Sequence, residues 1–182
     1  MSMYFDFENA EAFAAGAIGE PGQRTFYLQV RAEGRVVSVK CEKSQVQALS
    51  TYLRDMLADM PDTGPALDPT KSSLMNPVEQ DFVLGSIGLG VDRTNMRMVV
   101  QLEEMVFIDE EDDDDDIFDI LDDDDDDDDD ESPTTVLRVL LTPEQVRAFC
   151  DTADLFVTAG RATCKWCSQP INPTGHACPK FN

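Results

Sequence analysis

The sequence contains two stretches that match each other in the same order, and this constrains the fold more than any other feature. Residues 13–19 (FAAGAIG) align with residues 82–88 (FVLGSIG) at an offset of 69. A second set of matches, at an offset of 100, pairs Val39, Gln45, Val46 and Ala48 with Val139, Gln145, Val146 and Ala148. The second copy must therefore contain 100 − 69 = 31 extra residues between its two matching stretches. The chain is predicted to fold as two copies of one small unit.

Each copy is predicted to contain three strands and then a helix. Apolar runs and alternation predict strands at 13–18, 26–30 and 36–41 in the first copy, with the turn 32–34 between the last two. Its helix begins near Ser44, and apolar residues three and four apart form the buried face: Val46, Leu49, Leu53 and Met56.

The second copy repeats this plan, with strands predicted at 82–87, 96–102 and 136–141. In the middle strand, Met96, Met98 and Val100 are expected on one face. Thr142 is predicted to be the N-cap of the last helix and Pro143 its first residue, with Gly160 ending it. The predicted buried stripe of this helix consists of Val146, Phe149, Ala153 and Phe156.

The predicted fold class is α+β, in which duplicated βββα units form an antiparallel sheet covered on one side by two helices, followed by a C-terminal zinc-knuckle tail. Because one three-stranded unit makes a thin core, the two copies are expected to pack about a pseudo-twofold axis. The expected boundaries are 1–60 for the first repeat, 61–80 for a linker, 81–160 for the second repeat with a disordered acidic hairpin insertion at 103–132, and 161–182 for the zinc-binding tail.

Acidic residues are concentrated in one segment. The formal net charge is −23, yet residues 109–131 hold 19 of the 37 acidic residues and no Lys or Arg. Such a run repels itself and is expected to stay extended and disordered. Three roles are open to it: a solubilising spacer, a docking segment in which residues 117–121 (IFDIL) fold on a basic partner, or a nucleic-acid mimic or mask over basic residues such as Arg161, Lys165 and Lys180.

The C-terminal residues predict a zinc site. The pattern Cys164-x2-Cys167-x8-His176-x-Cys178 gathers the only histidine and three of the five cysteines. Four protein ligands would close the coordination shell, so the zinc is expected to be structural. Ser168 stands where many such knuckles have a glycine that adopts a positive φ. A disulfide is disfavoured, because five cysteines without a secretory signal fit a reducing compartment.

Few residues predict catalysis. If His176 binds zinc, its ring is committed to the metal, and a Ser-His-Asp arrangement is excluded. Cys41 and Cys150 lie on apolar faces and are expected to be core thiols. The glycine-rich run 85–90 precedes a strand, so it is predicted to be a close approach of strands and not a phosphate loop. An enzyme that uses Cys41, or Glu20 and Glu42 in the cleft between the repeats, remains the alternative function.

Three stretches resemble a known family. Residues 19–26 (GEPGQRTF), 39–46 (VKCEKSQV) and 175–179 (GHACP) are similar to an actinobacterial family of uncharacterised repeat proteins, domain of unknown function 3090. The resemblance covers nearly the whole chain except the acidic insertion. It implies a cytoplasmic protein of this size with a C-terminal Cys/His tail, including Cys164, Cys167, His176 and Cys178. The resemblance implies no activity.

We therefore expect a non-enzymatic, cytoplasmic, zinc-stapled protein-interaction module. Its partner is expected to be a protein, basic and docking on residues 109–131. A nucleic-acid-binding zinc protein using Lys165 and Trp166 is a third hypothesis, disfavoured because the chain has no long basic surface. No apolar run approaches the roughly 18 residues that span a membrane, and the first cation is Arg24, so neither a membrane span nor a signal peptide is expected.

Overall fold

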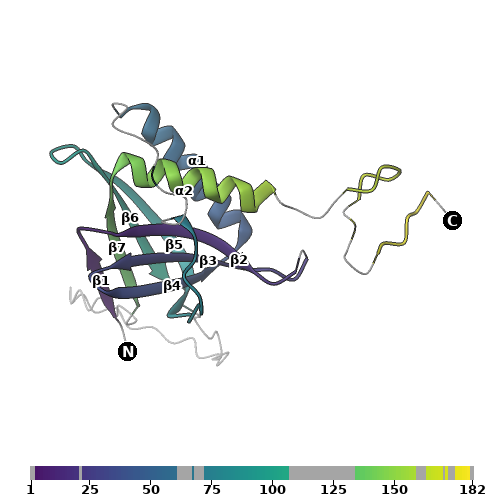
Figure 1. The fold of residues 1–182 in the computed structure, drawn as a ribbon, viewed down its shortest axis with the longest axis horizontal. Helices are drawn as coiled ribbons and strands as arrows, with labels where there is room; N and C mark the ends of the chain where they lie inside the picture. The colour runs from purple at the N-terminus through teal and green to yellow at the C-terminus, as the bar shows by residue number, and fades with distance from the viewer. Residues whose placement is uncertain are drawn as a thin grey trace, which may run out of the picture.

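The computed structural model is an α+β protein with one seven-stranded mixed sheet and two helices (Figure 1). It describes residues 3–20, 22–60, 67, 72–106, 134–158, 163–169, 171 and 175–180. In chain order the elements are β1 (Tyr4–Phe7), β2 (Ala12–Ile18), β3 (Thr25–Ala32), β4 (Arg35–Cys41), α1 (Lys43–Ala58), β5 (Phe82–Asp92), β6 (Arg97–Glu104), β7 (Val136–Leu141) and α2 (Pro143–Thr158). The order of three strands and a helix thus occurs twice after β1.

The sheet is mixed, which corrects the prediction of an antiparallel sheet. Its strand order is β1-β7-β6-β5-β4-β3-β2. Within β2–β4 and within β5–β7 every neighbouring pair is antiparallel, as expected for hairpins. The two sets meet at β4 and β5, which run parallel and pair through Val39 with Phe82 and Lys40 with Val83. A parallel pair is possible here because α1 lies between these strands in the chain and makes a long crossover.

β1 is the strand that the sequence analysis missed. It pairs in parallel with β7, and Tyr4 lies opposite Val136. Phe5 and Phe7 are buried while Tyr4 and Asp6 are exposed, so the alternation typical of a half-buried strand was present in the sequence. Four residues are too few to establish a strand without a partner, and the partner lies more than 130 residues away.

The positions of β1 and β2 show that the sheet is rolled. These strands are consecutive in the chain but lie at opposite ends of the strand order. Only residues 8–11 join them, and this connection spans at most about 18 Å. In a flat sheet six spacings of about 4.8 Å would place them about 29 Å apart. The sheet therefore curls, and the two helices lie next to each other on one side of it (Figure 1).

In the first turn of each helix, a glutamine contacts the other half of the protein. Gln45 accepts a hydrogen bond from the Glu42 amide at 2.8 Å and donates to the carbonyl of Leu84 in β5 at 3.3 Å. Gln145 accepts from the Thr142 amide at 2.9 Å and donates to the carbonyl of Ala10, just before β2, at 2.6 Å. Thr142 Oγ1 accepts from the Gln145 amide, which confirms the predicted N-cap.

The core lies between the rolled sheet and the helices. Phe13 of β2 stacks on Phe149 of α2, with 4.4 Å between ring centroids. Cys41 and Cys150 are buried in this core, as predicted. Phe156 is only partly buried, and Cys150 occupies the buried face of α2 instead.

Met96 also differs from the prediction, because it lies in the turn before β6 with φ 52° and is exposed. β5 extends to Asp92, beyond the predicted end of that strand. The Asp92 carboxylate accepts hydrogen bonds from the amides of Thr94 and Asn95 at 3.0 and 3.2 Å. These hydrogen bonds stabilise a turn that includes Met96, the residue that was predicted to begin the next strand.

Residues 72–76 pack on the outer face of the first half of the sheet. Gln29 of β3 is 1% exposed; it donates to Ser38 Oγ at 3.1 Å and to the Met75 carbonyl at 3.2 Å, and it accepts from the Met75 amide at 2.7 Å. A Cβ atom on Gly16 would lie 2.5 Å from the Leu74 side chain, so this glycine makes room for the covering segment. Part of the predicted linker is thus integral to the fold.

The acidic hairpin insertion lies almost wholly outside the described residues, which resume at Thr134 after Val106. Glu103 and Glu104, which the predicted boundary placed in the insertion, belong to β6. Gly160, the predicted end of α2, is also outside the described part of the chain. Across the described residues, neither helix is long and apolar enough to pass through a membrane.

Candidate metal centre

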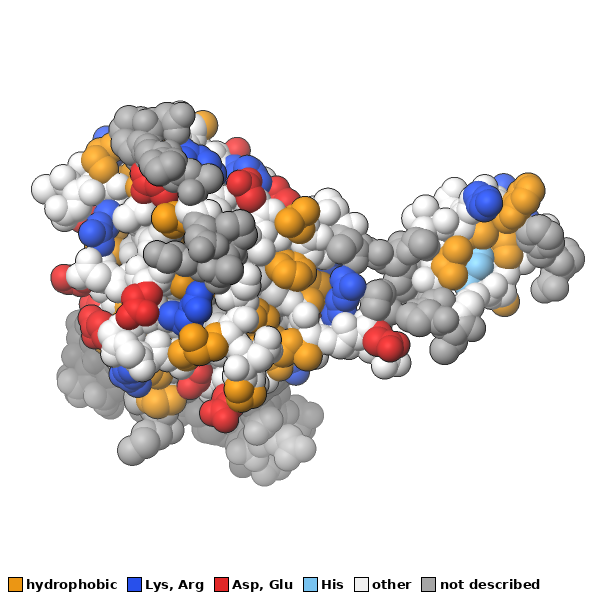
Figure 2. Space-filling model, viewed as in Figure 1, with side chains coloured by type: hydrophobic (Ala, Val, Ile, Leu, Met, Phe, Trp, Pro, Cys, Tyr) orange, Lys and Arg blue, Asp and Glu red, His pale blue; other side chains and the backbone are white. Residues whose placement is uncertain are grey.

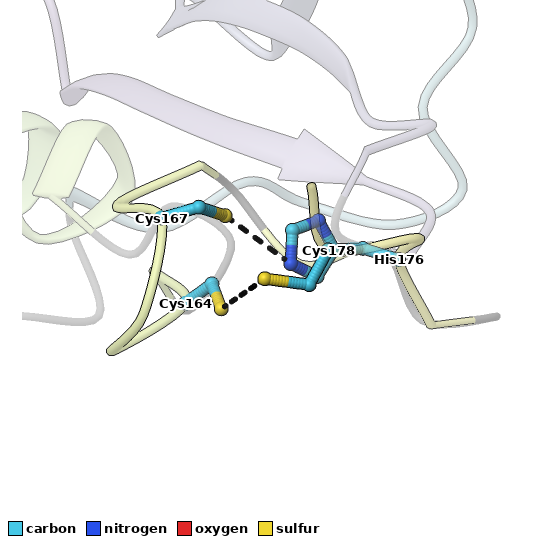
Figure 3. Close-up of side chains that lie close together, drawn as sticks. All are labelled: Cys164, Cys167, His176 and Cys178. Atoms are coloured by element: carbon cyan, nitrogen blue, oxygen red, sulfur yellow. Dashed lines mark hydrogen bonds between the residues drawn. The ribbon is translucent and has the colours of Figure 1, made fainter. Parts of the chain in front are cut away.

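The structure brings the four predicted ligands together. The ligand atoms of Cys164, Cys167, His176 and Cys178 all lie within 4.8 Å of one another (Figure 3). Cys164 Sγ lies 3.9 Å from Cys178 Sγ, and Cys167 Sγ lies 3.5 Å from His176 Nε2. Two short segments on either side of a chain reversal therefore supply two ligands each, and their side chains point into one common space.

The Cys164–Cys178 and Cys167–His176 distances match the edges of a tetrahedron around a metal ion. Bonds of about 2.3 Å to sulfur and about 2.0 Å to nitrogen place two sulfurs about 3.8 Å apart, and a sulfur and a nitrogen about 3.5 Å apart. The Cys164–Cys178 distance is far longer than the roughly 2.05 Å of a disulfide, and all five cysteines are free. The cluster could therefore bind a metal ion.

The backbone around Cys164 is folded into a tight turn. The Ser168 amide donates to the Cys164 carbonyl at 2.8 Å, and the Cys164 amide donates to the Gln169 carbonyl at 2.8 Å. Ser168 has φ 60°, in the left-handed region where a glycine is favoured. Serine therefore takes the conformation that the sequence analysis associated with a glycine in this type of turn. Gly175, with φ 93°, sets the backbone just before His176.

The same turn favours an ionised thiol. Backbone hydrogen bonds from Cys167 and then Trp166 lower the pKa of Cys164 to about 6, with a smaller contribution from the His176 side chain. Burial, followed by the neighbouring thiols Cys167 and Cys164, raises the pKa of Cys178. Thiols bind metals as thiolates, so the turn supplies Cys164 in the required form, while the raised pKa of Cys178 means that this thiol ionises more readily beside a bound cation.

A tetrahedral ion bound by all four residues has no remaining position for water. Of the described tail residues, Cys164 alone is buried. The described residues of the tail (residues 161–182) project away from the body of the protein (Figure 1), and among them no second buried side chain joins Cys164 to form an apolar core.

The other residues that the sequence analysis considered are not gathered into a site. Cys41 is buried, and burial followed by the charge of Glu42 raises its pKa to about 12. Glu20 and Glu42 are both exposed, and neither lines a described pocket. The glycine-rich run 85–90 lies inside β5, and β6 follows it. At Gly85 an added Cβ would lie 2.8 Å from the Met105 Cα, which is the predicted close approach of strands.

A polar pocket was not predicted. It lies between the residues after β1 and the β5–β6 turn, and Arg97 and Arg138 line it. Arg97 donates to the Glu8 carbonyl at 2.5 Å, and Arg138 forms an ion pair with Asp6 at 2.9 Å. Both guanidinium groups therefore tie β1 and the residues that follow it to the sheet. Local patterns could not reveal this pocket, because one of its walls depends on the unpredicted placement of β1.

Comparison with known proteins identifies one family. Residues 5–178 match the family described as "Protein of unknown function (DUF3090)". No curated protein and no solved structure matches the chain. The matched residues include both sets of three strands and a helix and all four members of the Cys/His cluster. The chain therefore belongs to the DUF3090 family of proteins of unknown function.

Proposed function

We propose that this protein is a non-enzymatic interaction module whose C-terminal tail is stapled by a structural zinc ion. The observation that carries this proposal is the convergence of four ligand atoms within 4.8 Å at the end of the chain. Three thiolates and one imidazole are donors that suit Zn²⁺. Reduced thiols require a reducing compartment, so we place the protein in the cytoplasm.

Zinc would contribute folding free energy that the tail lacks. The described tail residues are mostly exposed, and burial of apolar groups cannot order them. Binding of a structural zinc ion to a small site supplies on the order of 10 kcal/mol at neutral pH. The ion would therefore replace a hydrophobic core, and the ordered tail would present its exposed side chains in a fixed arrangement.

The body is proposed to be a duplicated unit with a pseudo-twofold relation between its halves. Gln45 and Gln145, which are 100 residues apart, each cap their own helix and donate to a backbone carbonyl of the other half. Such reciprocal contacts are typical of two copies related by a twofold axis. On this proposal the body is a scaffold that carries two recognition elements, the acidic segment (residues 109–131) and the tail.

The chemistry of the described residues supports binding more than catalysis. Burial raises the pKa of Cys150 to about 11, and Cys41 titrates higher still, so both thiols remain neutral near pH 7. His176 belongs to the Cys/His cluster. The acidic segment, with 19 carboxylates and no cation, is proposed to dock on a basic protein partner.

The experiment that tests this function combines metal analysis with partner capture. Purified protein is expected to contain about one zinc per chain, lost when Cys167 and Cys178 are both replaced by serine. Basic partners are expected to bind the intact protein and not a length-matched variant in which every Asp and Glu of residues 109–131 is replaced by Asn or Gln. A metal-free native protein with an ordered tail would refute the zinc staple. Capture of the same partners by the neutralised variant would refute docking on the acidic segment.

A further inference from the structure

We infer that the surface of the tail around Trp166 is a docking site for the acidic segment of the same chain. The surface consists of Lys165, Trp166 and Lys180, and we refer to it as the knuckle face. This inference rests on the proposed function, because the metal would hold the knuckle face in place. It names the acidic segment (residues 109–131) as the part of the chain that binds the knuckle face. It thereby links the acidic segment to the Cys/His tail, two features that the fold of the body does not explain.

The knuckle face exposes a large aromatic side chain. Trp166 lies between the ligands Cys164 and Cys167, and its side chain is 56% exposed. Lys165 beside it and Lys180 after the last ligand are exposed as well. In the space-filling view the projecting tail shows hydrophobic and basic side chains and no acidic ones (Figure 2). An exposed aromatic ring and exposed cations on the same small tail are suited to an anionic segment that also carries apolar groups.

Charge singles out the acidic segment as the occupant. The tail holds three Lys or Arg residues and no Asp or Glu, whereas the acidic segment holds 19 acids and no cation. The rest of the chain then holds 37 − 19 = 18 acids and 14 − 3 = 11 cations, a net charge of −7. The body therefore repels the acidic segment, and the tail attracts it. A zinc ion with three thiolates adds one negative charge, which leaves the tail at about +2.

The acidic segment also carries the apolar groups that the indole requires. Residues 117–121, IFDIL, place four apolar side chains between two runs of aspartate. Contact with the Trp166 ring would remove these groups and the indole from water, while the aspartates on either side meet Lys165 and Lys180. This arrangement places hydrophobic contact at the centre and ion pairs at the rim.

The connection that contains the acidic segment is long enough to reach far from the sheet. The described residues stop at Val106 and resume at Thr134, so 27 residues connect them. Half of this connection, about 13 residues, reaches up to about 45 Å from the sheet. Docking within one chain also benefits from an effective concentration that reaches the millimolar range for short flexible linkers. Weak individual contacts can then suffice, and a basic partner that captures the acidic segment would expose Trp166.

Trp166 provides a direct test because it is the only tryptophan in the chain. Its fluorescence and its quenching by acrylamide are compared in the intact protein and in the neutralised, length-matched variant described above. The intact protein is expected to show blue-shifted emission and a quenching constant roughly twofold lower than that of the variant at low salt. In 1 M NaCl the two proteins are expected to converge, since charges are then screened beyond about 3 Å.

A second variant, Lys165→Glu/Lys180→Glu in the intact chain, is expected to resemble the neutralised protein. Identical emission and quenching in all three proteins would overturn the docking inference. A difference that grows with protein concentration would assign the contact to a second copy and overturn docking within the chain. Protection of Trp166 by an oligo-dT strand, without an effect of the acidic segment, would assign the knuckle face to single-stranded nucleic acid and also overturn it.

Metal content is measured in every sample, so the two proposals fail separately. Absence of zinc from the native protein, with a retained charge-dependent difference, would reject both the staple and the role of the metal in holding the knuckle face, but keep the docking. Full zinc content with no charge-dependent difference would keep the staple and reject the docking. Cys167→Ser/Cys178→Ser in the intact chain is expected to abolish both the metal and the protection of Trp166, because the knuckle face then loses its fixed backbone.

Discussion

The thiol of Cys150 in α2 donates to the backbone carbonyl of Ser50 in α1 at 3.5 Å, and both residues are buried. The two positions are separated by the 100 residues that relate the matching helices in the sequence. One turn further along, Arg54 and Asp154 form an ion pair of 2.6 Å across the same interval. A twofold axis brings equivalent positions into contact in this way, so α1 and α2 cross where the proposed axis would pass.

The crossing point leaves no room for a larger side chain. Cys150→Leu is expected to lower the free energy of unfolding by about 1–3 kcal/mol, because Cys150 has no exposed surface and the added atoms would force α1 and α2 apart. Urea denaturation of both proteins measures the change. Leu155→Ala on the same helix is the control; its side chain is 69% exposed, and its effect is expected to stay within about 0.5 kcal/mol. Equal effects would contradict close packing at the crossing.

Stability is expected to fall in alkaline solution because of the buried thiols. Burial raises the pKa of Cys150 to about 11 and that of Cys41 to about 12, whereas both thiols titrate near 9 when unperturbed. Below pH 9 the folded and unfolded chains both carry neutral thiols, so the full stability is present. Above pH 9 the unfolded chain ionises first, and stability is lost until the folded thiols titrate as well.

The slope of this loss is about 1.4 kcal/mol per pH unit for each thiol. Between pH 9 and pH 10 the unfolded thiol goes from half to nearly fully ionised, so the free energy of unfolding is expected to fall by about 1 kcal/mol more in the wild type than in Cys150→Ala. Parallel pH profiles for the two proteins, measured by urea denaturation, would show that Cys150 is not held in its neutral form.

Gln29→Ala is expected to cost about 2 kcal/mol, because it removes a buried side chain from β3 and with it the hydrogen bonds to the amide and carbonyl of Met75. The segment 72–76 is expected to loosen from the sheet, and proteolysis after Met75 should become faster than in the wild type. Gln101→Ala is the control, since Gln101 is only partly buried and bonds to the exposed side of the sheet through Glu103. If the control is destabilised as much as Gln29→Ala, the covering role of residues 72–76 is wrong.

Arg54→Met is expected to destabilise the protein by less than about 1 kcal/mol, despite two ion pairs with Asp151 and Asp154 at 3.0 and 2.6 Å. All three side chains are substantially exposed, and exposed ion pairs contribute little after solvent screening. The difference from the wild type is expected to vanish in 1 M NaCl, measured by urea denaturation. A larger loss that persists in salt would mean that packing of the Arg54 stem matters more than its charge.

Metal removal is expected to affect the tail and not the body. A strong chelator should make the tail sensitive to protease, whereas the thermal unfolding of the body should change little, because the described tail residues bury almost no surface of their own. Ser168→Gly is the matched control; it relieves the positive φ of 60° and should retain the metal. Unfolding of the body on chelation would show that the tail supports the sheet.

Much of the local structure could be predicted from the sequence. Apolar alternation and helical spacing located three strands and a helix in each half, and the Thr142 cap followed from its side chain. The Cys/His cluster was predictable as well, since two pairs of ligands on either side of a turn need only a short reversal to meet. In each case residues close together in the chain determine the result, because backbone geometry and side-chain periodicity act over a few residues.

Only the tertiary structure decided how these elements combine. The parallel pairing of β1 with β7, the short parallel junction of β4 with β5, and the burial of Gln29 beneath residues 72–76 all join segments far apart in the chain. Met96 follows an apolar pattern yet lies in a turn, because the Asp92 side chain closes the hairpin there. Such pairings depend on whether segments far apart in the chain pack closely and form hydrogen bonds with each other. The residues next to one another in the sequence do not determine this.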